Sequence, residues 1–504
     1  MRRVLTAVTG VILTLVLAVG GTSQFAGAAK RAPGDQQWDV VLIITDDQPI
    51  GTLAAMPNLT RLLVGRGVNY TNAVVPTSLC CPSRTSLLTG QLAPTTGIYS
   101  NESDTGYGGY PALKASGLEN ATLATALDTA GYDTAYFGKY LNEYGPAYDG
   151  TAPPGWDTWR SFTTQQSGKY RRYGVTDAVP FGQRPRRVDQ EFVKKYSTTF
   201  FGQEAAAHIR TAASDRPQFT VFAPYAPHSP FNAEREYRGT SRVPADYFNA
   251  SVLEQDVSDK PAYIRDLPAS GLVEGQPPGV NLSRQMDTLR SVDDQVRALY
   301  DAVKARGRLD RTLFVYVSDN GYMHGEHRLD GKGYPYLKST NVPLVMRWGQ
   351  GSPGITDDRL TIANVDIHAT VLQAAGLPNT SAGTSMLNDR NQQGVQLVGA
   401  ESTSRVVRPP FCAWRTRDEL FVRYGSGEEE YYDYRTDPFE LDNRVDDPAA
   451  RSRVEQLRGL ARGACAKPPP GFGPTFDLPR WRPKRAGTAP PPQPEPDTDR
   501  VARA

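Results

Sequence analysis

Four short apolar runs, each followed by charged or polar residues, constrain the fold of this chain more than any other feature. They begin at Asp39 (DVVLIIT, then Asp46 and Asp47), Thr134 (TAYF, then Lys139), Phe219 (FTVFA, then His228) and Leu313 (LFVYV, then Asp319 and Asn320). Such runs without polar alternation are typical of strands buried on both faces, as in a parallel sheet. Helical patterns over 123–129, 204–213 and 286–306 lie between them. We therefore expect an α/β domain with a large, mostly parallel central sheet flanked by helices.

The polar residues at the strand ends predict a single site, because ligands of such sheets bind outside the carboxyl ends of the strands. Asp46, Asp47, Asp319 and Asn320 offer only oxygen ligands. Ca²⁺ and Mg²⁺ prefer oxygen, whereas Zn²⁺ prefers His or Cys. Two adjacent carboxylates also repel each other unless a cation lies between them. The sequence therefore predicts a hard divalent cation at this edge of the sheet.

Four regions are expected along the chain. Residues 1–29 have a basic start, an apolar run and a small-residue cleavage site, which predicts a secretory signal peptide; an uncleaved membrane anchor is the alternative. Residues 35–377 form the sheet domain. Residues 378–465 begin with a connector to 404 and continue with a small antiparallel sheet and one helix, over 451–462. The proline-rich residues 466–504 are expected to be a disordered tail.

Export of the chain has consequences for its cysteines and partners. We expect a secreted protein with no stable membrane insertion after signal cleavage, and an oxidising compartment permits disulfides. Cys412 and Cys465 lie in one C-terminal segment and are the expected pair. This leaves the adjacent Cys80 and Cys81 unpaired. The net charge of +2, with Arg and Lys dispersed, gives no reason to expect nucleic acid as a partner.

The segment LCCPSRTSLLTG, from Leu79 to Gly90, predicts a short helix. Proline favours the first helical turn, and glycine favours the residue after the end. Cys80 would lie just before the helix N-terminus, where free amides and the helix dipole favour an anion, and Arg84 follows one turn into the helix. A site that combines a cation, two lysines, an arginine and a histidine suits a tetrahedral oxyanion ester, a sulfate or a phosphate.

The motifs resemble those of the sulfatase family, within the alkaline-phosphatase-like superfamily. The signature C-x-P-S-R-x-x-x-x-T-G matches Cys80 to Gly90. The other matches follow in family order: TDDQ from Thr45, GKYLNEYG from Gly138, APYAPHSPF from Ala223, SDNGYMHGEHRL from Ser318 and YYDYRTDPFELDN from Tyr431. GKYLNEYG is most similar to the N-acetylglucosamine-6-sulfatase branch and its heparan sulfatase relatives. The resemblance covers about residues 40–443.

This resemblance implies a role for each matching residue. A formylglycine-generating enzyme would oxidise Cys80 to formylglycine, whose hydrate attacks sulfur. A metal, by similarity Ca²⁺ rather than Mg²⁺, would be held by Asp46, Asp47, Cys80, Asp319 and Asn320. Arg84 would stabilise the hydrate, Lys139 and Lys332 would bind sulfate, and His228 would protonate the leaving alcohol or bind sulfate. Substrate contacts are expected from Asn142, His324 and His327.

Two departures from the family pattern leave one role open. Many sulfatases have a histidine two residues after the lysine of the GK motif, where this chain has Leu141, so the base for sulfate release is unassigned. Asn142, Glu143 or a histidine of the later loop are candidates. In that later loop, Met323 takes the usual histidine position and His324 follows it.

The expected function is removal of sulfate from a sulfated carbohydrate, with N-acetylglucosamine 6-sulfate as the candidate substrate. One alternative is a phosphonate or phosphate ester hydrolase of the same superfamily. The other is a non-catalytic protein that binds sulfated glycans. A basic insert over about 162–195 suits a polyanionic glycan near the site.

Overall fold

The computed structural model describes residues 37–145, 152–163, 170–176, 190–212, 216–269, 276–351, 354–400, 402, 406–473 and 475–477. The expected signal peptide, much of the basic insert and the tail beyond residue 477 lie outside the described residues. Within the described ranges, no helix combines the length and the apolar character that crossing a bilayer requires.

The central sheet has eight strands in the order β13-β2-β12-β9-β1-β8-β4-β5. Their bounds are β1 Asp39–Thr45, β2 Val68–Tyr70, β4 Asp133–Gly138, β5 Thr158–Ser161, β8 Gln218–Ala223, β9 Thr312–Ser318, β12 Leu344–Trp348 and β13 Ile355–Asp357. Strand β1 is parallel to both of its neighbours, β8 and β9, whereas β12 is antiparallel to both β9 and β2. The predicted large, mostly parallel sheet is therefore confirmed.

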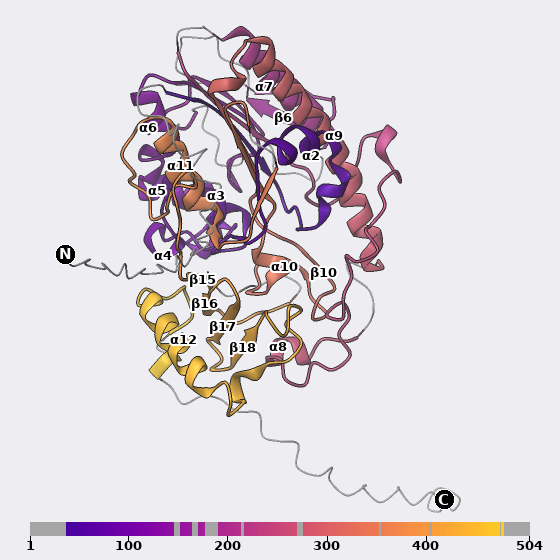
Figure 1. Cartoon of the computed structure of the whole chain (residues 1–504), viewed down its shortest axis with the longest axis vertical. Helices are drawn as coiled ribbons and strands as arrows, with labels where there is room; N and C mark the ends of the chain where they lie inside the picture. Colours follow the sequence, from indigo (N-terminus) through magenta and orange to yellow (C-terminus); the bar gives the residue numbers. More distant parts are fainter. Residues whose placement is uncertain are drawn as a thin grey trace, which may run out of the picture.

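Both faces of the sheet are buried, which explains why its strands have no polar alternation. Val40, Leu42 and Ile44 of β1 pack in a core with α3, α6 and α11, whereas Val41 and Ile43 pack in a second core with α2, α7 and α9. Figure 1 shows these helices on the two sides of the sheet. The bounds are α2 Pro57–Leu62, α3 Cys80–Thr89, α6 Leu123–Thr129, α7 Ser197–Thr211, α9 Pro278–Ala305 and α11 Ala363–Ala374.

Shorter elements complete the large domain. Two-stranded pairs are formed by β3 (Ala73–Val74) with β14 (Thr361–Ile362), β6 (Tyr173–Thr176) with β7 (Gln190–Val193), and β10 (Met323–His324) with β11 (Asp330–Gly331). The short helices are α4 (Ala93–Thr96), α5 (Gly109–Ser116), α8 (Ala262–Arg265) and α10 (Leu337–Thr340).

The C-terminal part forms a second, antiparallel sheet of four strands in the order β15-β16-β17-β18 (Figure 1). The strands are β15 Val395–Gly399, β16 Phe411–Arg415, β17 Glu419–Tyr424 and β18 Glu429–Asp433, and α12 (Arg451–Ala464) packs on them. The small sheet and its helix were predicted, but β15 lies in the expected connector. That expectation is corrected: five residues with Gln396 at the second position give no clear apolar run, and the strand is defined by its pairing with β16.

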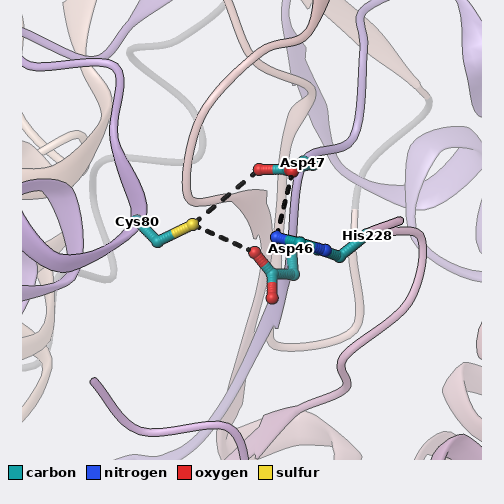
Figure 2. A group of neighbouring side chains, drawn as sticks. All are labelled: Asp46, Asp47, Cys80 and His228. Atoms are coloured by element: carbon teal, nitrogen blue, oxygen red, sulfur yellow. Dashed lines mark hydrogen bonds and ion pairs between the residues drawn. The ribbon is translucent and has the colours of Figure 1, made fainter. Parts of the chain in front are cut away.

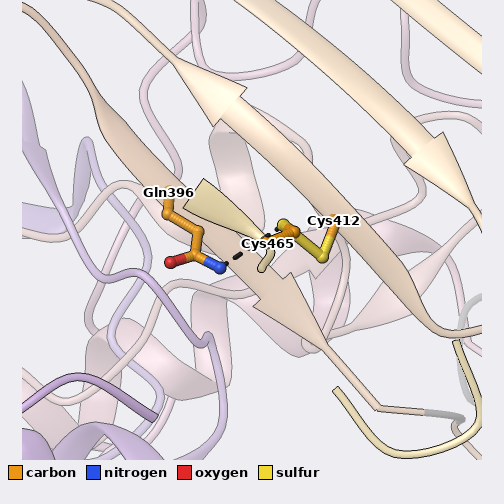
Figure 3. Close-up of a disulfide and its surroundings, with 3 residues drawn as sticks. All are labelled: Gln396, Cys412 and Cys465. Atoms are coloured by element: carbon orange, nitrogen blue, oxygen red, sulfur yellow. Dashed lines mark hydrogen bonds between the residues drawn. A yellow bond between two sulfur atoms is a disulfide. The ribbon is translucent and has the colours of Figure 1, made fainter. Parts of the chain in front are cut away.

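The predicted disulfide joins Cys412 of β16 to Cys465 at the end of α12 (Figure 3). Their Cα atoms are 6.2 Å apart, and both residues are buried. The bond closes the small sheet against its helix. Cys80 and Cys81 are buried and unpaired.

Candidate active site

The carboxyl ends of four neighbouring parallel strands bring the predicted residues together. Strand β9 leads to Asp319 and Asn320, and its neighbour β1 leads to Asp46 and Asp47. The next two strands in the sheet, β8 and β4, lead to His228 and to Lys139. Cys80 is the first residue of α3, whose residues are all buried. The site predicted at this edge of the sheet is thus present as one cluster.

Cys80 lies against the two adjacent carboxylates (Figure 2). Its Sγ is 3.3 Å from Asp46 Oδ1 and 3.8 Å from Asp47 Oδ1. Candidate ligand atoms of Asp46, Asp47, Cys80 and His228 all lie within 4.8 Å of one another. Asp47 has a φ of 65°, in the left-handed region. Because consecutive side chains of a strand point to opposite faces, this break at the strand end allows both carboxylates to reach Cys80.

Three cations balance the three buried carboxylates. Lys139 Nζ is 2.6 Å from Asp46 Oδ2, and Arg84 Nε is 2.7 Å from Asp319 Oδ2. Lys332 Nζ contacts Asp47 Oδ1 and is 2.7 Å from Cys80 Sγ. Arg84 also donates through Nη1 to the Lys139 carbonyl oxygen at 2.7 Å. Each buried charge therefore has an opposite charge beside it, which is the condition for its burial.

The charges set the protonation states of the cluster. Burial raises the pKa of the Cys80 thiol far above its ordinary value, and the charge of Asp46 raises it further. Burial alone would also raise the pKa of Asp46, but Lys139 and His228 outweigh burial and leave this pKa well below its ordinary value. Burial lowers the pKa of His228 despite the nearby Asp47. Asp46 and Asp47 are thus ionised beside a neutral thiol, whereas burial and the charge of Asp46 raise the pKa of Asp319.

The donor set fits a hard divalent cation. Asn320 Nδ2 donates to Asp47 Oδ1 at 2.7 Å and to the Gly321 carbonyl oxygen at 2.9 Å. Its Oδ1 is buried without a hydrogen-bond partner among the described residues. This unpartnered oxygen lies beside carboxylates, and amide and carboxylate oxygens are the ligands that Ca²⁺ and Mg²⁺ prefer. The residues present are therefore suitable for holding such an ion.

His228 is held by a residue that the sequence did not single out, Tyr225. His228 Nε2 is 3.5 Å from Asp47 Oδ2. Its Nδ1 lies 2.8 Å from both the Tyr225 hydroxyl and the Ser229 carbonyl oxygen. The centroids of the His228 and Tyr225 rings are 4.7 Å apart. The only sequence signal for Tyr225 is its place within APYAPHSPF.

A cavity of about 350 Å³ opens beside the cluster. Lys139, Lys332, His228 and the predicted Asn142 line it. Unpredicted lining residues are Asn101, Glu102, Phe162 and Tyr225. Through this cavity, a small organic ester can reach the cluster around Cys80.

Next to Leu141, the two candidates Asn142 and Glu143 both line the cavity. Leu141 borders the cavity, but its side chain is buried in the core. Glu143 Oε2 accepts a hydrogen bond from the Ser103 amide at 2.8 Å. Asn142 Oδ1 is buried without a partner among the described residues, and an amide is no base. The role that the sequence left open therefore stays open.

The two loop histidines are not in the lining of this cavity, so their expected contact with substrate stays a prediction. His324 is buried, with Nε2 2.7 Å from Gln285 Oε1, and burial lowers its pKa to about 3. Gln285, from α9, donates to the Asp47 carbonyl oxygen at 3.0 Å. His327 Nδ1 is 2.7 Å from Glu254 Oε2. The spacing in the sequence predicted that both histidines lie near the site, but the turn after Asn320 places them outside the lining of this cavity.

Comparison with known proteins is consistent with this geometry. A family model described as Sulfatase matches residues 39–377. A Drosophila melanogaster protein, Extracellular sulfatase SULF-1 homolog, is 30% identical over 360 residues, covering 70% of this chain and 30% of that protein. The N-acetylglucosamine-6-sulfatase of Homo sapiens is 29% identical over 377 residues, covering 72% of this chain and 65% of that protein. The chain thus spans less than two thirds of the length of either relative.

A solved structure supports the fold. It is described as a complex with its substrate D-glucosamine-2-N,6-O-disulfate, and it superposes with a TM-score of 0.68 at 19% identity. The match covers 86% of this chain and 98% of that chain.

His327 generates a prediction about stability. Burial lowers its pKa, but hydrogen bonds to Glu254 and Glu440 outweigh burial and raise the pKa from 6.5 to about 9. A raised folded-state pKa contributes stability that is complete below pH 6.5 and is lost as pH rises through about 9. The shift corresponds to about 3 kcal/mol. In urea unfolding, His327→Gln should therefore lower the free energy of unfolding by about this amount near pH 6, and by much less near pH 9.5. An equal loss at both pH values would contradict the ion pair.

Proposed function

The chain belongs to the sulfatase family, and from this premise we propose that it is a sulfuric ester hydrolase that removes sulfate from a sulfated carbohydrate. One observation carries the proposal. Cys80, at the start of α3, lies against Asp46 and Asp47 and is contacted by Lys332, beside an open cavity. Cations and a helix N-terminus at one point suit an anionic ester.

The chemistry of Cys80 favours its conversion to formylglycine. A thiol whose pKa is raised by burial carries little thiolate, and the thiolate is the nucleophile. As formylglycine hydrate, residue 80 would supply one hydroxyl for attack on sulfur and a second for expelling sulfate afterwards. Arg84 is fixed by Asp319 and by the Lys139 carbonyl oxygen, one turn into the same helix.

Calcium is the proposed metal, held by Asp46, Asp47, Asp319, Asn320 and the converted residue 80. When bound, it would neutralise sulfate oxygens and lower the pKa of the attacking hydroxyl. Lys139 and Lys332 would bind the remaining sulfate oxygens from either side of Cys80. Their present contacts with Asp46 and Asp47 support this placement.

His228 is proposed to protonate the leaving alcohol. The Ser229 carbonyl oxygen can only accept, so it favours a proton on Nδ1 of His228. Nε2 then donates only when the ring is protonated. Burial disfavours that state in the free protein, but the negative charge of a bound sulfate ester would favour it. Tyr225 would keep the ring in place.

The proposed substrate is a sulfated sugar of the N-acetylglucosamine 6-sulfate type. Its support is the relative named N-acetylglucosamine-6-sulfatase, together with the GKYLNEYG segment, whose Lys139 and Asn142 line the cavity. We also propose that the protein is secreted, as the signal-like start, the disulfide and the relative named extracellular support. A formylglycine-generating enzyme is its maturation partner.

Replacement of the two cysteines separately tests the function. Cys80→Ala should reduce hydrolysis of 4-nitrophenyl sulfate on the order of 10⁴-fold or more, because it removes the nucleophile. Cys81→Ala is the matched control. Cys81 is buried, and burial raises the pKa of its thiol to about 12 against hydrogen bonds to Thr85 and to the backbone of Gly109 and Asn142. These contacts involve none of the proposed catalytic or metal-binding side chains, so activity should stay within a few-fold.

Three results would contradict the proposal. Equal losses of hydrolytic activity in both variants would indicate that Cys80 has only a packing role. Faster turnover of a phosphate diester than of the sulfate ester would favour the phosphoesterase alternative. Binding of sulfated glycans without turnover would favour the binding-protein alternative.

Metal dependence gives a second test with a readout besides activity. Calcium should raise the unfolding temperature of chelator-treated protein, since a ligand at 100 times its Kd contributes about 2.7 kcal/mol. Asn320→Leu removes an oxygen ligand and should abolish most of this rise, whereas Asn320→Asp keeps an oxygen and should retain it. No calcium-dependent rise in the parent protein would exclude the proposed ligand set.

A further inference from the structure

We propose that a second cavity, between the two sheets, binds a sugar unit that carries an anionic substituent. This cavity has a volume of about 520 Å³ and shares no lining residue with the cavity beside Cys80. The identity of this sugar rests on the proposed function: it is a further unit of the glycan whose sulfate is removed at Cys80. The volume is in the range of pockets that hold small molecules.

The cavity lies where the large domain meets the C-terminal sheet. Its walls come from the segment 244–251, from the segment 323–338 that contains β10 and α10, and from Pro438–Glu440 of the C-terminal part. Figure 1 shows β10 and α10 at this boundary. Buried pairs hold the walls together: His327 lies between Glu254 and Glu440, and Glu440 accepts from the Leu337 amide at 3.1 Å. The cavity is thus a built feature of the junction.

Lys338 provides the charge that a ligand would meet. Its Nζ lies 4.0 Å from the centre of the Tyr247 ring. No hydrogen bond or ion pair joins this ammonium to any residue in the part of the chain that the structure describes. Burial lowers the pKa of Lys338, against the opposing effect of Glu326. A half-buried ammonium without an ion pair is less well solvated than one in water, and a bound anion would stabilise it.

The carboxylates of the lining do not supply that partner. Both Glu440 oxygens accept from Leu337, and Tyr434 also donates to Oε1. Glu326 Oε2 accepts from the His324 amide, whereas its Oε1 is buried without a hydrogen-bond partner among the described residues; its charge acts on Lys338 only from beyond ion-pair distance. Asp246 is exposed at the rim, where water screens its charge. An incoming carboxylate or sulfate is therefore the natural partner of Lys338.

Aromatic side chains supply the surface for a sugar ring. Tyr247 and Tyr336 are buried in the wall, and Phe439 is 42% exposed. Phe439 is among the few large apolar side chains of the described residues that stay exposed. An apolar ring face beside an ammonium without an ion pair matches a pyranose ring with one anionic group.

The second cavity is within reach of a chain bound at Cys80. Ile50, in its wall, is three residues after Asp47, so their Cα atoms are at most about 11 Å apart. Lys332, at Cys80, and Lys338 belong to the same segment. An oligosaccharide can therefore occupy both cavities, whereas a small aryl ester occupies only the first.

Calorimetric titration of Cys80→Ala protein, which cannot turn substrate over, tests the proposal. The probe is a heparan-type tetrasaccharide that carries glucuronate and a 6-sulfated N-acetylglucosamine. Adding Lys338→Met or Phe439→Ala should raise its Kd at least tenfold, and Lys338→Arg should largely restore the parent value. The matched control Lys304→Met, which changes an exposed lysine on α9, should leave the Kd unchanged. A neutral chitotetraose should bind more weakly and should not respond to Lys338→Met.

Stability separates binding from misfolding. Lys338→Met should keep or raise the unfolding temperature, because it removes a half-buried charge that forms no ion pair among the described residues. Phe439→Ala changes an exposed side chain and should fold in any case. An unchanged Kd in both variants, or an equal response of the neutral probe, would overturn the second site. Failure of the parent protein to hydrolyse 4-nitrophenyl sulfate would instead overturn the proposed function and leave this binding contrast intact.

Discussion

The balance of buried charge around Cys80 is the constraint on which the rest of the site depends. Asp46, Asp47 and Asp319 are neutralised by Lys139, Lys332 and Arg84, and each of these charges alone would be strongly destabilising in the interior. The order β9-β1-β8-β4 provides this balance, because the carboxyl ends of adjacent parallel strands meet at one edge. A neutral thiol lies at the centre of the cluster, and such a thiol is unreactive. The same burial that assembles the site therefore explains why Cys80 would need to be converted.

Much of this arrangement could be predicted because it follows from local patterns. Strands buried on both faces give apolar runs, and their polar ends identify the edge that holds the site, as for β1 and Asp46. Elements defined by tertiary contacts could not be predicted. Strand β15 is short and depends on pairing with β16. Tyr225 and Gln285 act by holding His228 and the Asp47 backbone, contacts that no spacing in the sequence reveals. His324 does not line the cavity beside Cys80, and the direction of the turn that places it could not be read from spacing.

One segment, residues 323–338, connects the two cavities and the two sheets. It carries Lys332 to Cys80 and Lys338 to the second cavity, and His327 joins it to Glu254 and to the C-terminal Glu440. The C-terminal part therefore does more than cover the large domain, because residues 438–440, which follow β18, complete a wall at the junction. On this proposal, residues at the strand ends remove the sulfate, and residues at the junction of the large domain with the C-terminal part select the glycan.

Mass spectrometry of the tryptic peptide over residues 67–84, taken from protein that is active on a sulfate ester, tests the role of Cys80 most directly. The peptide contains both adjacent cysteines, so Cys81 is an internal control. The expected result is the mass loss of a thiol-to-aldehyde conversion at Cys80, with a single thiol, that of Cys81, available for alkylation. Two alkylated thiols in fully active protein would contradict the proposed catalytic role of a converted Cys80.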